Sequence, residues 1–147
     1  MMRLTGFLAL FLSFIAGAMA QTTTVAPSAA TISPAAIAQI KPGSYSGKLT
    51  EEGGKGSADV KMDIKHVTKD GRVTARVQSS HARQACAASL PLNGLVLPTA
   101  EMRLEVDDGS PEGCERVYNV KLVGSSISGT YIDAVTRTGG KLVPKKK

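Results

Sequence analysis

The chain has 147 residues, which is enough for one ordinary domain and too short for two large ones. It carries 18 lysines and arginines against 12 aspartates and glutamates, and its 42% of hydrophobic residues excludes a wholly disordered polyelectrolyte. The chain has no tryptophan, and its three phenylalanines all lie in the first 14 residues. This composition argues against nucleic-acid binding on aromatic platforms and against a large cofactor enzyme.

Residues 1–20 have the features of a secretory signal peptide. Arg3 gives a positive start, an apolar run follows over residues 7–16, and Ala18-Met19-Ala20 is a small-residue cleavage site. The run is shorter than the roughly 20 residues that a membrane-spanning helix needs. We therefore expect a periplasmic or secreted protein with no transmembrane segment in the mature chain.

Cys86 and Cys114 are the two cysteines of the chain. In an oxidising compartment such a pair most simply forms one disulfide. The alternative is a redox or metal pair, but no C-x-x-C is present and a zinc site would need further ligands at suitable spacing. The sequence thus predicts a structural disulfide, with no metal and no cofactor.

Residues 21–42 are rich in Thr, Ala, Ser and Pro, which is typical of a flexible spacer. One short helix is plausible within it. Ser33 can cap such a helix, Pro34 suits its first position, and Pro42-Gly43 would end it. This helix could plug or flank the domain that follows.

From Gly43 the hydrophobic pattern has a period of two. Five alternating positions share one face of a predicted strand: Ala58, Val60, Met62, Ile64 and His66. Asp70-Gly71 is a strong hairpin turn. Centred there, the hairpin pairs Ile64 with Val77 and places Lys65 opposite Arg76.

A second hairpin centres on Gly124-Ser125, where glycine at the first position suits a type II′ turn. This register gives four pairs: Leu122 with Ile127, Val120 with Gly129, Tyr118 with Tyr131, and Arg116 with Asp133. It brings two aromatic and then two oppositely charged side chains together.

Two further turns complete the pattern. Gly53-Gly54 is a looser turn that pairs Tyr45 with Met62 and Leu49 with Ala58. Asn93-Gly94 predicts a third tight turn, and Pro98 suggests a bulge or an edge in the strand after it.

The chain therefore reads as all-β: an antiparallel up-and-down meander of about eight strands closing into a small barrel over residues 43–147. A two-sheet sandwich is the alternative. The expected strands are 43–51, 57–68, 71–81, 84–92, 95–107, 114–123, 126–135 and 138–144.

Gly43-Ser44-Tyr45-Ser46-Gly47 and Ser128-Gly129-Thr130-Tyr131 resemble strand motifs of the lipocalin and avidin-like barrels, the calycin group. The resemblance implies a meander barrel that binds something at its open end. Without tryptophan it does not extend to biotin binding. The second motif is also near one of the periplasmic lysozyme inhibitors, although its spacing differs and the positive net charge disfavours a cationic partner.

The longer connections of the meander gather at one end of the barrel, where functional residues usually lie. The candidate ligand-binding residues at this end, beside the predicted disulfide, are His81, Arg83, Arg116, Tyr118, Tyr131 and Asp133. Arginine suits a carboxylate or phosphate, and the tyrosine pair suits an apolar or ring-bearing ligand. Equally open are an ordinary ion pair between Arg116 and Asp133 and simple core packing of the two tyrosines.

No catalytic motif is complete, so we expect a binding protein rather than an enzyme. Its partner would be a small molecule or an envelope macromolecule, and not nucleic acid. The alternative is a cell-envelope interaction or inhibitor module with a solid core. The volume of the barrel interior distinguishes the two.

Overall fold

The structure is a computed structural model that describes residues 31–53, 56–80, 86 and 89–144. The predicted signal peptide, most of the predicted spacer, and the candidate residues His81 and Arg83 lie outside the described residues. No helix within them is long and apolar enough to cross a membrane.

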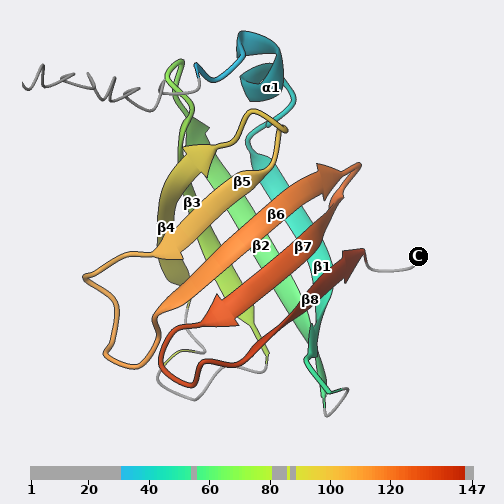
Figure 1. The fold of residues 1–147 in the computed structure, drawn as a ribbon, viewed down its shortest axis with the longest axis vertical. Coiled ribbons are helices and arrows are strands. Elements are labelled where there is room, and N and C mark those ends of the chain that lie inside the picture. The colour runs from blue at the N-terminus through green and yellow to red at the C-terminus, as the bar shows by residue number, and fades with distance from the viewer. Residues whose placement is uncertain (1–30, 54–55, 81–85, 87–88, 145–147) are drawn as a thin grey trace, which may run out of the picture.

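The described chain contains one short helix and eight strands (Figure 1). Their bounds are α1 Pro34–Ala38, β1 Gly43–Glu51, β2 Ser57–Val67, β3 Arg72–Ser79, β4 Leu90–Val96, β5 Met102–Val106, β6 Arg116–Val123, β7 Ser126–Asp133 and β8 Gly139–Pro144. Each strand pairs antiparallel with the next, and β8 returns to pair with β1. The all-β meander barrel is confirmed, and the sandwich alternative is wrong.

The β6–β7 hairpin has the predicted register throughout. Arg116 lies opposite Asp133, and Tyr118 lies opposite Tyr131. Gly124 has a φ of 60°, which the first position of a type II′ turn requires and which glycine adopts without steric cost. The β1–β2 register is also confirmed, since Tyr45 faces Met62.

Asn93-Gly94 does not form the predicted turn but lies inside β4. A Cβ on Gly94 would overlap the carbonyl oxygen of Arg103 on β5, so the glycine permits two backbones to approach at a sharp bend of the barrel. The chain instead reverses at Leu97–Glu101, where Ala100 adopts a φ of 59°. Pro98 therefore lies in a turn and not in a strand.

The β2–β3 register differs from the prediction by two residues. One residue of the difference arises at the turn, where Val67 faces Val73. A bulge between Ile64 and His66 adds the other, so that Met62 faces Val77. Asp63, rather than Lys65, faces Arg76, which replaces the expected like-charge pair with an opposite-charge pair. The bulge also leaves His66 exposed instead of inward.

The barrel interior is filled mainly by aliphatic side chains, together with the two tyrosines Tyr118 and Tyr131. The largest side chains with almost no exposure are Tyr118, Leu49, Met62, Leu92, Met102, Leu104, Ile127 and Leu142. They come from seven of the eight strands, so all sides of the barrel contribute to one core. Such close packing is how a barrel of about eight strands fills its interior.

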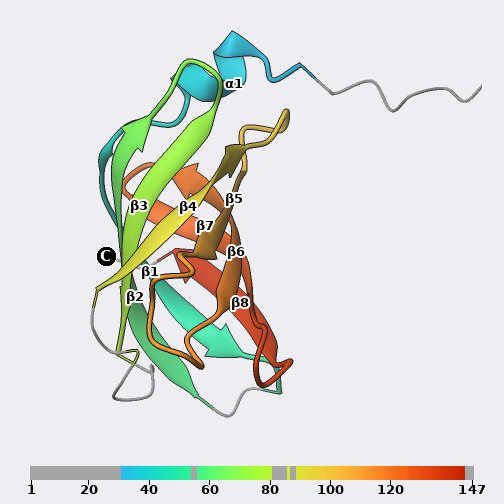
Figure 2. The ribbon, with the colours of Figure 1, turned by 90° about the vertical axis from the view of Figure 1, so that its left-hand side faces the viewer.

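The two ends of the barrel are closed differently. Figure 2 shows α1 over the end that holds the β2–β3 turn. Ser33 caps the helix and Pro34 begins it, as predicted, and the buried Ala36 and Ile40 join the core. The opposite end, here called the long-loop end, holds the β1–β2, β3–β4, β5–β6 and β7–β8 connections.

Candidate functional site

A disulfide joins two connections at the long-loop end. Cys86, between β3 and β4, is bonded to Cys114, between β5 and β6, with 5.6 Å between their Cα atoms. Both residues are buried. The predicted pairing is confirmed, and the bond fixes two of the four connections relative to each other.

Arg116 and Asp133 form an ion pair at the mouth of the barrel. They lie opposite each other on β6 and β7, with 3.4 Å between Nε and Oδ2. Only 10% and 11% of the two side chains are exposed, so the pair is far more buried than the other ion pairs of the described chain. The carboxylate therefore neutralises the guanidinium that a bound anion would need.

Asp133 also organises the start of the β7–β8 connection. Its Oδ1 accepts hydrogen bonds from the backbone N–H groups of Val135, at 3.1 Å, and Thr136, at 3.0 Å. Burial raises the pKa of Asp133, but these bonds and the charge of Arg116 outweigh it and hold the pKa below its usual value. One side chain thus stabilises both the charge of Arg116 and the geometry of the connection.

Tyr118 lies one layer deeper and is fully buried. Its ring centroid is 6.3 Å from that of Tyr131, a tilted aromatic pair across the two strands. Its Oη makes no hydrogen bond of normal geometry among the described residues, although the Arg116 guanidinium lies close enough to interact with it. Burial raises the pKa of Tyr118, and the nearby charge of Arg116 opposes this shift only in part.

Sequence reasoning missed three polar residues at this mouth: Glu51, Ser79 and Thr138. With Arg116, Tyr131 and Asp133 they line a pocket of about 30 Å³. Burial and the charge of Glu51 raise the pKa of Tyr131. Glu51 and Ser79 continue the inward alternation of β1 and β3, a signal that could have identified them.

The pocket is too small for an organic ligand. A volume near 30 Å³ corresponds to about one water molecule, whereas ligand pockets usually enclose roughly 300–1,000 Å³. Within the described residues the predicted site residues Arg116, Tyr118, Tyr131 and Asp133 do come together. They form a packed polar layer across the mouth rather than an open cavity.

The described residues contain no cluster of three His, Cys, Asp or Glu side chains that could hold a metal ion.

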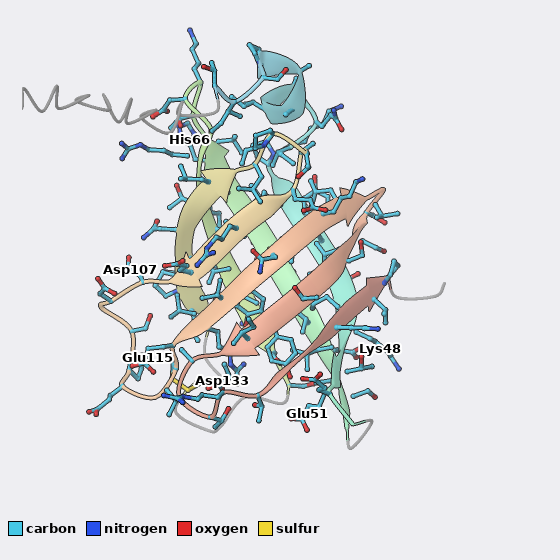
Figure 3. The ribbon with its side chains drawn as sticks, in the orientation of Figure 1. Lys48, Glu51, His66, Asp107, Glu115 and Asp133 are labelled. Atoms are coloured by element: carbon cyan, nitrogen blue, oxygen red, sulfur yellow. A yellow bond between two sulfur atoms is a disulfide. The ribbon has the colours of Figure 1, made fainter. Side chains whose placement is uncertain are left out.

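Charge is distributed unevenly along the barrel axis. Figure 3 shows Glu51, Glu115 and Asp133 at the long-loop end, and His66 at the other end. Among described residues, the long-loop connections and the strand residues that directly adjoin them hold seven acidic and two basic side chains. The acidic ones are Glu51, Glu52, Asp107, Asp108, Glu112, Glu115 and Asp133, and the basic ones are Arg116 and Arg137. The parts of these connections that lie outside the described residues contribute Lys55 and Arg83 to the sequence of this end, and an acidic excess remains.

The other end carries the opposite balance. Its described connections and first strand residues hold three basic side chains, Lys41, Lys69 and Arg72, against Asp70 and Glu101. A net charge of +6 therefore conceals an acidic surface around the disulfide. A partner responds to the local field of the surface that it approaches.

In comparisons with known proteins, no family model, no curated protein and no solved structure matches the chain. The resemblance to calycin barrels thus remains an interpretation of two short motifs within a meander barrel.

Proposed function

We propose that the protein is an extracytoplasmic, non-enzymatic binding module that holds a basic protein partner at its long-loop end. One observation carries this proposal: a barrel with a filled interior presents an acidic, disulfide-linked end. Of the two functions expected from the sequence, this is the interaction module with a solid core.

The filled interior supports a macromolecular partner over a small molecule inside the barrel. The mouth pocket of about 30 Å³ would have to grow at least about tenfold to enclose a ligand of ordinary size. That growth would break the buried ion pair between Arg116 and Asp133 and disturb the hydrogen bonds by which Asp133 holds the β7–β8 connection. Binding to the outside of the rigid barrel needs no such rearrangement.

The disulfide supports a location outside the cytoplasm. Structural disulfides persist in oxidising compartments, and the predicted signal peptide over residues 1–20 agrees with that location. The bond also limits the movement of two connections, which reduces the entropy that binding would cost.

The local charge supports a basic partner. Asp133 is buried and paired with Arg116, but the six other acidic side chains in the described part of this end would attract a cationic surface and raise its association rate. The argument from net charge against cationic partners does not apply when the partner approaches this end.

Two exposed valines allow a matched test. Val135, at the long-loop end, is 50% exposed, and Val123, beside the turn at the other end, is 48% exposed. A photo-crosslinking amino acid at each position, in the cells that make the protein, should capture a protein at position 135 and none at position 123. Capture at position 123 alone would contradict the proposal.

Native mass spectrometry of the chain purified from the periplasm of an expression host provides an independent check. We expect the mass of the oxidised protein without a small-molecule adduct, because the interior is filled. A reproducible, stoichiometric adduct would favour the ligand barrel instead.

A further inference from the structure

A groove of about 570 Å³ is lined by residues of β1, β7 and β8 and of the connection that follows β1. In the barrel, β8 lies between β7 and β1 (Figure 1). The floor of the groove is formed by Gly139 and Gly140, which begin β8 and have no side chains. Ile132 of β7 lies beside Gly139 on one side. On the other side the chain leaves β1, and the N–H of Glu52 donates to Gly139 O at 2.9 Å.

The steric requirement for glycine differs between these two positions. A Cβ on Gly140 would overlap the carbonyl oxygen of Thr50, so closure of the barrel requires this glycine. A Cβ on Gly139 would lie 3.0 Å from the Tyr131 carbonyl oxygen, which is tight but allows small adjustments. Packing therefore requires glycine more strictly at position 140 than at position 139. The absence of a side chain at Gly139 leaves space in the groove.

The walls of the groove differ in chemistry. From the Cβ position of Gly139, Ile132 Cγ1 is 3.9 Å away and Glu52 Oε2 is 4.0 Å away. A carboxylate oxygen and an aliphatic carbon thus both lie within 4.0 Å of the position that a side chain at residue 139 would occupy. Ile132 is 51% exposed, unusually high for an isoleucine in a strand.

We propose that this groove is the anchor site for a lysine or arginine side chain of the basic protein partner, an inference that rests on the proposed function. The aliphatic stem of such a side chain packs on Ile132 while its charged head meets Glu52. Val135, at the same end, is a further exposed apolar side chain. Lys141 also lines the groove on β8, so its charge offsets part of the attraction that Glu52 exerts on the cationic head.

Peptide titrations test this assignment on the full chain expressed and purified from a periplasm. The probe is acetyl-Val-Lys-Val-Lys-Val-amide, and its counterpart replaces both lysines with glutamates. Amide NMR signals of Glu52, Thr130 and Ile132 should shift with the lysine peptide and not with the glutamate peptide. Absence of saturable shifts at these residues would overturn the proposal.

Two variants separate the groove from general attraction by the acidic end. Glu52→Gln should weaken binding of the lysine peptide about fivefold, the scale of one exposed ion pair. Glu112→Gln removes the same charge from the β5–β6 connection and should change binding less than twofold. Equal effects of both substitutions would overturn the groove assignment. Ile132→Ser should also weaken binding, because it removes the apolar wall.

The two proposals fail separately. Crosslinking at position 135 without an effect of Glu52→Gln would leave the proposed function standing and remove the groove. If the chain alone forms dimers that Glu52→Gln dissociates, the occupant is a second copy and not a different protein.

Discussion

Arg116 and Asp133 face each other across the β6–β7 ladder, and their ion pair is the most buried one among the described residues. Asp133 has a second role in holding the N–H groups of Val135 and Thr136. Removing either partner of a buried pair leaves a charge without compensation. Replacing Arg116 and replacing Asp133 should nevertheless lower the free energy of unfolding by different amounts.

We expect Asp133→Ala to lower the free energy of unfolding by about 3 kcal/mol, because it leaves a buried guanidinium and two backbone N–H donors without their partner. Arg116→Met should cost less, since Asp133 keeps its backbone hydrogen bonds. Urea unfolding at neutral pH measures both, with the exposed Lys121→Met as the control. A larger loss for Arg116→Met than for Asp133→Ala would contradict this ranking.

The pKa of Asp133 predicts how stability depends on acid. Because the folded protein holds this pKa below its usual value of 3.8, the folded state favours the ionised carboxylate. The resulting stability is present above the unfolded value and is lost as the pH falls through the folded pKa. Urea unfolding from pH 6 to pH 2 should therefore show a smaller decline for Asp133→Asn than for the natural chain.

Asp63 also has a lowered pKa, chiefly because Ser44 donates a hydrogen bond to it. The natural chain and Asp133→Asn both retain Asp63, so the difference between their curves of unfolding free energy against pH reports on Asp133 alone. Identical slopes would show that Asp133 titrates alike in the folded and unfolded states.

Tyr118 buries a hydroxyl that makes no hydrogen bond of normal geometry among the described residues, with the Arg116 guanidinium nearby. Tyr118→Phe removes that unsatisfied group and should raise the free energy of unfolding by about 1 kcal/mol at pH 7. Burial raises the pKa of Tyr118 above 10.0, so stability is lost as the pH rises through the folded pKa. The variant should lose less stability than the natural chain at alkaline pH. A loss of 1 kcal/mol or more at pH 7 would contradict the prediction.

Gly94 and Gly109 provide a matched pair of glycine substitutions. A Cβ on Gly94 would overlap the backbone of Arg103, whereas a Cβ on Gly109 would meet one atom, Asp107 Oδ1, at 3.9 Å. We expect Gly94→Ala to cost about 3 kcal/mol or more and Gly109→Ala to cost less than about 1 kcal/mol. Thermal unfolding compares them, and equal melting temperatures would rule out a structural role for the Gly94 bend.

The sequence predicted those parts of the fold that depend on local chemistry. Gly124 has the φ its turn needs, and alternation then placed Arg116 opposite Asp133. Asn93-Gly94 misled because the same dipeptide suits a tight turn and a sharp strand bend, and only the neighbouring strand distinguishes them. The bulge after Ile64 follows from the pairing with β3 and has no local signal.

The candidate site was predicted in part for the same reason. Arg116, Asp133 and the two tyrosines belong to one hairpin, so its register alone brings them together. Glu51 reaches the same mouth through the pairing of β1 with β8. Alternation along β1 gives Glu51 its inward parity, but the registers of β8 with β1 and with β7 have no local signal, and they decide that this carboxylate lies near Tyr131.

The disulfide and the seam of the barrel constrain different parts of the chain. The bond encloses β4 and β5, whereas the seam joins β1 to β8, the first and last strands of the sequence. In loop-closure terms, pairing Leu49 with Leu142 is the costliest step of folding. We therefore expect the β1–β8 seam to form last and to open first in hydrogen exchange, with the covalent link already in place on the far side of the barrel.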